Sequence, residues 1–287
     1  MMGGGRGMTV LDELLDFLKE DTPAGDVTSE AVIPDITCTA AVRAEQDGTL
    51  AGIEEATLLF THFGVAVTGG KRDSDTVRRD ESVLILSGTA KNILLVERTA
   101  LNILGRMSGI ATRTAAMAAI VRRENPTCRV AGTRKTCPGF RRFDKKAVQI
   151  GGGDPHRMNL SDGILIKDNH LAIVPLEEAI RKARAHSAYK KIEVEVESAN
   201  DAVLAAQAGA DIIMLDNMTP LQVQETLAVL KKNGIRDRVV IEISGGIDAE
   251  TLADYAACGV DVISMGSLTH SVRNFSFSLE IRPVTAT

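Results

Sequence analysis

The chain has 287 residues, 44% of them apolar, with a formal net charge of −5 and a pI of about 5.6. That length and apolar content allow one large α/β barrel or two smaller domains, and the acidic balance disfavours general binding to polyanions or anionic membranes. Two Tyr, seven Phe and no Trp supply too few rings for stacking on single-stranded nucleic acid.

Cysteine usage and the N-terminus indicate a cytoplasmic protein. The four cysteines form no C-x-x-C pair, which argues against a zinc knuckle, a redox motif or a disulfide framework. No apolar run approaches membrane-spanning length, and the opening MMGGGRGM lacks the apolar core of a signal peptide. Its glycines predict a flexible extension, with Met8 as an alternative start.

The first 90 residues predict a small α+β unit. TVLDELLDFLKE (9–20) has helical spacing, and Thr9 with Asp12 fits a capping box. An Asp47-Gly48 turn then separates two strand-like runs, EEATLLFTHFG predicts a helix that ends at Gly64, and SVLILSG predicts a strand.

Residues 91–125 favour a helix with an interruption near SGIAT and a stop at Pro126. Steps of about four residues place Arg98, Asn102, Arg106 and Arg113 on or near one face. A solvated stripe is the simplest interpretation of such a face.

Beyond residue 126, short β-branched runs alternate regularly with helical segments. The runs are CRVAG, GILIK, KIEVEVE, DIIMLDN, VVIEIS and VDVISMG. This βα repeat predicts parallel strands buried on both faces, and the number of units favours a barrel over a doubly wound sheet. No G-x-G-x-x-G follows the first strand, which weakens a dinucleotide-binding alternative.

The alternating tail NFSFSLEIRP predicts a half-buried strand that returns to the N-terminal unit. The predicted fold class is therefore α/β: a C-terminal open or irregular βα barrel with a smaller N-terminal α+β domain. The expected boundaries are 113–271 for the barrel, and 9–112 completed by 272–287 for the smaller domain.

Polar residues follow every predicted barrel strand. In chain order they are Arg134 with Lys135, Lys167, Glu195, Asp216, Ser244 with Gly245, and Gly266. From Lys167 onward the intervals are 28, 21, 28 and 22 residues, about one βα unit each. These side chains should therefore converge on the rim where βα barrels carry catalysis.

This rim combines both signs of charge with glycine-rich turns. SGGI and MGSL let backbone amides approach a phosphate-sized anion, and Glu195 with Asp216 suits Mg²⁺, ribose hydroxyls or acid/base work. Residues 133–157 hold seven Lys or Arg against two acids, which implies a ligand with several negative charges. Of these cations, Arg141, Arg142, Lys145 and Lys146 are expected on an exposed helix face. His156 and His170 have no second His at helical spacing, so a zinc site is rejected.

TRKTCPGFRRFDKKAVQIGGGDPHR (133–157), followed by LSDGILIKDNHL, closely resembles the signature of the quinolinate phosphoribosyltransferase family, the carboxylating nicotinate-nucleotide pyrophosphorylases. The resemblance covers nearly the whole chain through EDTPAGDVT, ERTALNILGRMSGIAT, IEVEVES, IIMLDNM, ISGGI and GSLTHS. It implies a pentosyltransferase of de novo NAD biosynthesis that converts quinolinate and phosphoribosyl pyrophosphate to nicotinate mononucleotide, pyrophosphate and CO₂ with Mg²⁺.

The resemblance also implies residue roles and a homodimer or higher oligomer with shared active sites. Lys135, Lys167, Glu195 and Asp216 are the expected catalytic residues, and the two acids are also the expected metal ligands, directly or through water. Arg98 is expected from the neighbouring subunit. The full expected substrate-binding set is Arg98, Arg134, His156, Arg157, Ser244, Gly245, Gly246, Gly266 and His270.

Three alternatives stay open at this stage. One is a same-fold transferase for another base without decarboxylation, which the full cationic set argues against. Another is the molybdenum-transport-linked relative, which shares much of the TRK and HR signature. The third is a non-catalytic phosphoribosyl-ligand binding protein, which has no need of Glu195, Asp216 and Lys135 together. Cys137, Phe140 and FDKK depart from the family pattern and bear on fine positioning only.

Overall fold

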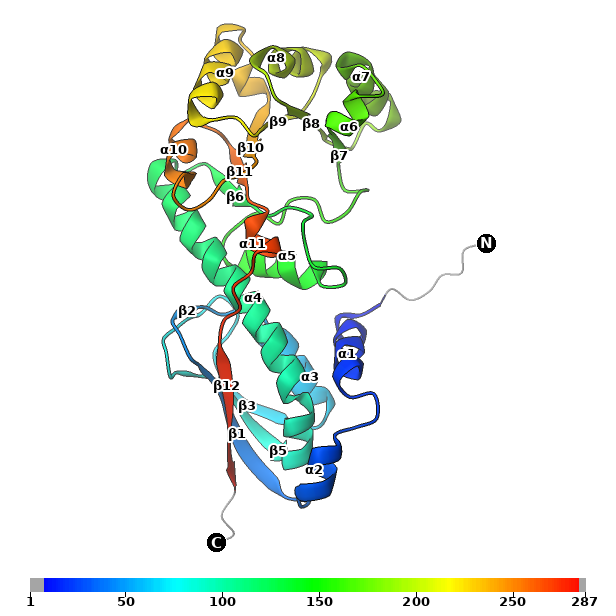
Figure 1. The fold of residues 1–287 in the computed structure, drawn as a ribbon, viewed down its shortest axis with the longest axis vertical. Helices are drawn as coiled ribbons and strands as arrows, with labels where there is room; N and C mark the ends of the chain where they lie inside the picture. The colour runs from blue at the N-terminus through cyan, green and yellow to red at the C-terminus, as the bar shows by residue number, and fades with distance from the viewer. Residues whose placement is uncertain (1–7, 284–287) are drawn as a thin grey trace, which may run out of the picture. The chain divides into compact units, whose positions relative to one another are not determined.

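The computed structural model describes residues 8–283. The predicted N-terminal extension lies outside them except for Met8. The chain divides into two compact units, one built from residues up to Thr112 together with those from Val272, the other from Arg113–Ser271 (Figure 1). No helix within the described range, the 35-residue α4 included, has both the length and the apolarity that a membrane crossing requires.

The first unit is an α+β structure around one antiparallel sheet with strand order β12-β1-β5-β3. The strand β12 (Phe277–Pro283) pairs with β1 (Thr37–Ala44) from Cys38 to Ala44, so the alternating tail completes this sheet. The other elements of the unit are α1 (Val10–Asp21), α2 (Val27–Val32), β2 (Gly48–Thr49), α3 (Ile53–His62), β3 (Ala66–Gly70), β4 (Thr76–Val77) and β5 (Ser82–Thr89).

Two local predictions for this unit can be compared with the structure. The capping box of α1 is confirmed, since Oγ1 of Thr9 accepts from the Asp12 amide at 3.1 Å and Oδ2 of Asp12 accepts from the Thr9 amide at 2.9 Å. The run that begins at Gly48 pairs with β4, whereas the run before it pairs with β5 and β12. The Asp47-Gly48 turn therefore separates two sheets.

The predicted interruption of the long helix is wrong, because α4 (Ala90–Glu124) runs without a break through SGIAT. The glycines serve packing instead. A Cβ on Gly109 would lie 2.3 Å from the carbonyl oxygen of Arg273, and one on Gly105 would lie 2.8 Å from that of Phe275. The Phe275 amide also donates to the Gly105 carbonyl at 2.8 Å. These glycines let a second backbone segment run against the helix, which offsets their low helix propensity.

The second unit is an open βα barrel, as predicted. Its six parallel strands have the order β6-β11-β10-β9-β8-β7, so β6 (Arg129–Ala131) and β7 (Ile164–Ile166) form the two edges. The remaining strands are β8 (Ile192–Val196), β9 (Ile212–Asp216), β10 (Val240–Ser244) and β11 (Val262–Ser264). The cationic stretch 133–157 connects the two edge strands, including α5 (Arg141–Ile150).

Helices cover the outer face of this sheet (Figure 1). They are α6 (Asp168–Leu171), α7 (Leu176–His186), α8 (Ala199–Ala208), α9 (Pro220–Lys232), the 3₁₀ turn Arg236–Arg238 and α10 (Leu252–Ala257). The short helix α11 (Ser267–His270) follows β11 and lies beside α5 in the view of Figure 1. Alternate strand residues such as Ile213, Leu215 and Ile243 are buried in the core between sheet and helices. Because side chains alternate along a strand, the residues between them face the barrel interior.

Candidate active site

A cavity of about 480 Å³ lies at the carboxyl ends of the barrel strands. Residues from β7, β8, β9 and β10 and the loops that follow them line it, which is where βα barrels carry their sites. The lining residues are Gly132, Thr133, Arg134, Lys135, His156, Arg157, Leu165, Lys167, Glu195, Met214, Asp216, Asn217, Glu242, Ser244, Gly245, Gly246 and Ser264.

Four cations line the cavity, namely Arg134, Lys135, Arg157 and Lys167. Burial, and then repulsion from Arg134, lower the pKa of Arg157. The Nε atom of Arg134 is buried and has no hydrogen-bond partner among the described residues. Two guanidinium groups that repel each other, one with an unused donor, are suited to an anionic ligand that bridges them.

Two carboxylates, Glu195 and Asp216, lie at adjacent strand ends in the same cavity. Lys167 forms an ion pair with Oε2 of Glu195, at the end of β8. At the end of the next strand, burial and then the neighbouring Glu195 raise the pKa of Asp216. Asn217 donates to Oδ2 of Asp216 at 2.7 Å. Two carboxylates that raise each other's energy favour a bound cation, and oxygen donors suit Mg²⁺.

The turn after β10 is shaped by a close approach that only glycine allows. Gly245 has φ +97°, and a Cβ there would lie 2.1 Å from Oδ1 and 2.9 Å from the backbone nitrogen of Asn217. The Asn217 amide donates to the Ser244 carbonyl at 2.9 Å, which fixes the two turns against each other. Ser244, Gly245 and Gly246 thus present a short polar backbone segment to the cavity, as a phosphate site requires.

A second turn supports Lys135. A Cβ on Gly266 would lie 3.1 Å from Cδ of Lys135 and 3.1 Å from Cδ2 of His270. Oγ1 of Thr269 donates to the Lys135 carbonyl at 2.8 Å. Gly266 and His270 therefore pack around the base of the loop that carries Lys135, while neither is among the residues that line the cavity.

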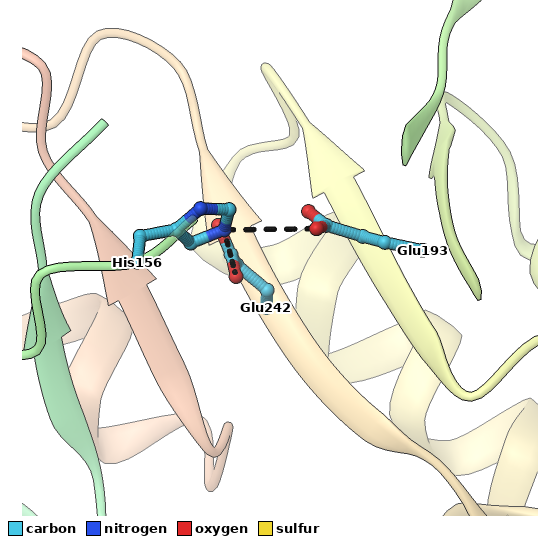
Figure 2. A group of neighbouring side chains, drawn as sticks. All are labelled: His156, Glu193 and Glu242. Carbon is cyan, nitrogen blue, oxygen red and sulfur yellow. Dashed lines mark ion pairs between the residues drawn. The ribbon is translucent and has the colours of Figure 1, made fainter. Parts of the chain in front are cut away.

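Deeper in the barrel, His156 reaches two buried glutamates, Glu193 on β8 and Glu242 on β10 (Figure 2). Its Nε2 lies 3.4 Å from Oε2 of Glu242 and 3.6 Å from Oε2 of Glu193. The two glutamates are only 2% and 5% exposed, respectively. We call these three residues the floor cluster, and Lys167, Glu195 and Asp216 the rim cluster.

The floor cluster has strongly perturbed titration. Burial opposes a charged ring, but hydrogen bonds to Glu193 and Glu242 outweigh it and raise the pKa of His156 to about 10. Burial raises the pKa of Glu193. The Arg157 amide donates to Nδ1 of His156 at 2.8 Å, which a ring protonated on both nitrogens could not accept. That contact opposes a second proton on the ring, so the geometry assigns His156 a single proton, on Nε2.

Most residues expected at the rim line one cavity: Arg134, Lys135, His156, Arg157, Lys167, Glu195, Asp216, Ser244, Gly245 and Gly246. Arg98 is exposed on α4 in the other unit. Asn217, Glu193 and Glu242 were not predicted. Alternation in IEVEVE and VVIEIS is the available signal for the two glutamates, because it places them on the same face as Glu195 and Ser244.

The expected exposed face of α5 is wrong for Lys145, which is only 1% exposed. Its Nζ donates to the Pro155 carbonyl. Burial, and then repulsion from Arg141, lower its pKa from 10.5 to about 8. Lys145 therefore links α5 to the later part of the cationic stretch 133–157. Of the four cations, only Arg142 is exposed.

Family models give the assignment. A model described as "Quinolinate phosphoribosyl transferase, C-terminal domain" matches residues 110–280, and the corresponding N-terminal domain model matches residues 26–108. The chain belongs to the quinolinate phosphoribosyl transferase family. This confirms the family that the sequence resembles.

Relatives of this family member match over most of their length. The chain is 46% identical to the probable nicotinate-nucleotide pyrophosphorylase [carboxylating] of Methanothermobacter thermautotrophicus, over 95% of this chain and 99% of that protein. It is 39% identical to the human nicotinate-nucleotide pyrophosphorylase [carboxylating], over 84% and 82%. The crystal structure of NadC from Streptococcus pyogenes has a TM-score of 0.89 at 37% identity and covers 98% of this chain and 100% of that one. This similarity also confirms the predicted fold class.

Proposed function

We propose that the barrel cavity catalyses the decarboxylating phosphoribosyl transfer: quinolinate and phosphoribosyl pyrophosphate give nicotinate mononucleotide, pyrophosphate and CO₂. The chain is a transferase of this family, and its relatives are named as carboxylating nicotinate-nucleotide pyrophosphorylases. One observation carries the proposal: the lining of a single cavity combines four cations, the strand-end carboxylates Glu195 and Asp216 above the buried Glu242, and the glycine turn after β10. That distribution suits a dicarboxylate beside a phosphorylated sugar.

The four cations of the cavity hold quinolinate in this proposal. Arg134 and Arg157 bind its two carboxylates, since guanidinium forks match carboxylate geometry, and Lys167 adds a point charge. Lys135 lies between the two substrates. The backbone of Ser244, Gly245 and Gly246 binds the 5′-phosphate of the cosubstrate.

Glu195 and Asp216 serve the ribose and the metal. The pKa of Asp216 is raised by burial and by Glu195, and two adjacent carboxylates offer the oxygen donors that suit Mg²⁺, held directly or through water. When bound, the ion would supply positive charge to the departing pyrophosphate. As pyrophosphate leaves, the two carboxylates stabilise the positive charge that develops at C1′. Lys167 forms an ion pair with Glu195 and so orients that carboxylate.

Decarboxylation then depends on the substrate's own ring. The pyridine nitrogen attacks C1′ and becomes quaternary, so the adjacent carboxylate leaves as CO₂ and its bonding electrons stay on the ring carbon. That carbanion takes up one proton to give nicotinate mononucleotide. Lys135 is our candidate donor, because a positioned amine at the cavity is within the usual class of general acids.

The test follows both products from one mixture. Quinolinate, nicotinate and a no-base control are each incubated with phosphoribosyl pyrophosphate and Mg²⁺, and CO₂ and pyrophosphate are measured. Equal release of both products with quinolinate alone is expected. Pyrophosphate without CO₂, released with nicotinate, would assign the non-decarboxylating alternative. No release with either base would leave ligand binding or the molybdenum-transport-linked relative.

The active unit in this proposal is a homodimer in which Arg98 enters the neighbouring site. Arg98 is an exposed cation on a long helix, which suits a role across an interface. Mixing inactive Arg98→Ala and Lys167→Ala proteins, after dissociation and reassociation, should restore up to about a quarter of wild-type activity, because half the hybrid sites are intact in a two-fold dimer. A fully active monomer would contradict a shared site.

We place this enzyme in the cytoplasm. All four cysteines are free, two of them buried, as a reducing compartment allows. Fractionation of cells that express the chain, followed by the transferase assay on each fraction, tests this location.

A further inference from the structure

The floor cluster has no part in the proposed chemistry, yet it is built into the same strands as the rim. Glu193 precedes Glu195 by two residues on β8, and Glu242 precedes Ser244 by two residues on β10. Side chains two apart on a strand share a face, so the glutamates lie one layer below the rim. Buried carboxylates are costly unless they are paired, and the Oε1 atoms of both have no partner in the described chain.

One His and two Glu within 4.8 Å of one another resemble a divalent metal site. The hydrogen bonds argue against it. Because Nδ1 of His156 accepts the Arg157 amide, the ring proton lies on Nε2, the atom that faces both carboxylates. A protonated nitrogen has no lone pair for a metal. The ring N–H on Nε2 therefore takes the place between the two carboxylates that a metal ion would occupy.

Hydrogen bonds to successive residues fix the loop that carries His156. Oδ1 of Asp154 accepts the His156 amide at 2.8 Å, and buried Lys145 donates to the Pro155 carbonyl. His156 itself has φ +57°, a conformation that a non-glycine residue adopts only when its surroundings enforce it. Both ring nitrogens are occupied within the protein, one by the Arg157 amide and one by the glutamates. The side chain of Arg157, the next residue, lines the cavity.

We propose that Glu193 and Glu242 are positioning residues that act through the His156 ring to hold Arg157 where its guanidinium meets a substrate carboxylate. His156 is then a positioning residue as well. This inference rests on the proposed binding of quinolinate by Arg157. It assigns to two buried acids a specific effect on the affinity for the dicarboxylate.

The first test removes one acceptor. Glu242→Ala should raise the KM and the Kd for quinolinate about 10-fold, since one charge-assisted contact is misdirected, while kcat and the KM for phosphoribosyl pyrophosphate stay within about 2-fold. Glu242→Gln should restore most of the affinity, because an amide oxygen still accepts from Nε2. Glu242→Leu fills the volume without an acceptor and replaces the Ala variant if that one fails to fold.

The second test asks whether the effect passes through Arg157. In an Arg157→Ala background, Glu242→Ala should raise the quinolinate KM no further, which is strong non-additivity between coupled residues. Thr226→Val is the control, since Thr226 is equally buried, on α9, and is not among the residues that line the cavity. It should lower the melting temperature without separating the two KM values.

The outcomes separate this inference from the proposed function. A wild-type protein that neither binds nor consumes quinolinate would overturn the proposed function. Normal wild-type activity, with equal losses for both substrates in Glu242→Ala, would overturn only the positioning role. Full additivity with Arg157→Ala, or no recovery in Glu242→Gln, would overturn it as well.

Discussion

The rim and the floor of the barrel each bring a side-chain nitrogen against carboxylates, and strand β8 supplies an acid to both. At the rim, the paired side chains of Lys167 and Glu195 are 42% and 14% exposed. At the floor, those of His156 and Glu193 are 16% and 6% exposed. The same types of charge therefore lie two residues apart in very different surroundings.

Exposure decides what each cluster can do. Water and ligands can replace the partners of a half-exposed ion pair, so the rim is available for binding and chemistry. Removing one partner from a buried pair leaves an uncompensated charge, which is strongly unfavourable, so the floor is fixed. In this barrel, the position of a charged residue along its strand therefore determines its role as much as its residue type does.

The largest expected effect tests the rim. Lys167→Ala should lower kcat/KM for the transfer at least about 10²-fold, the scale of one preorganised electrostatic group, and Lys135→Ala should do the same. Lys182→Ala is the matched control, because it removes a cation whose side chain is 60% exposed and whose ion-pair partner is Glu178 on α7. Steady-state kinetics of the three variants decide the point. Near-normal turnover in Lys167→Ala would remove the contrast between rim and floor.

The rim was predictable from sequence because it depends on period and spacing. Intervals of one βα unit, from Lys167 through Glu195 to Ser244, place these residues at equivalent strand ends, and parallel strands bring such ends together. The family resemblance added their identities. No comparable regularity was needed for the fold class, since alternating β-branched runs and helical segments already favour a parallel βα barrel.

The floor was not predictable, because it depends on contacts across long sequence separations. Alternation places Glu193 on the inner face, but nothing in the sequence brings His156 to it from a loop 37 residues earlier. The burial of Lys145 was missed for the same reason. A lysine in a charged helix usually indicates a solvated face, and its hydrogen bond to the Pro155 carbonyl is visible only in the folded structure. Gly109 predicted a helix break, whereas tertiary packing explains it.

The next effect concerns the loop above the floor and is measured as stability. A pKa lowered from 10.5 to about 8 means that the folded protein releases the Lys145 proton before the unfolded chain does. Stability should therefore rise with pH between about 8 and 10.5, by at most about 3.5 kcal/mol at 1.4 kcal/mol per pH unit. Lys145→Met lacks this contribution, so urea unfolding of both proteins across that range should give curves that diverge. Parallel curves would show that the lysine is solvated.

The smallest expected effect tests the phosphate side of the rim. Gly245→Ala would drive a methyl group into Asn217 and so displace the partner of Asp216. The KM for phosphoribosyl pyrophosphate should rise about 10-fold, and quinolinate binding should change less, because strain of roughly 1–3 kcal/mol is confined to this turn. Gly209→Ala is the matched control: its φ of +100° is similar, but no atom lies within 4 Å of the added carbon. It should cost stability alone. Equal KM values in the two variants would mean that left-handed backbone strain, rather than the contact with Asn217, accounts for the glycine at the rim.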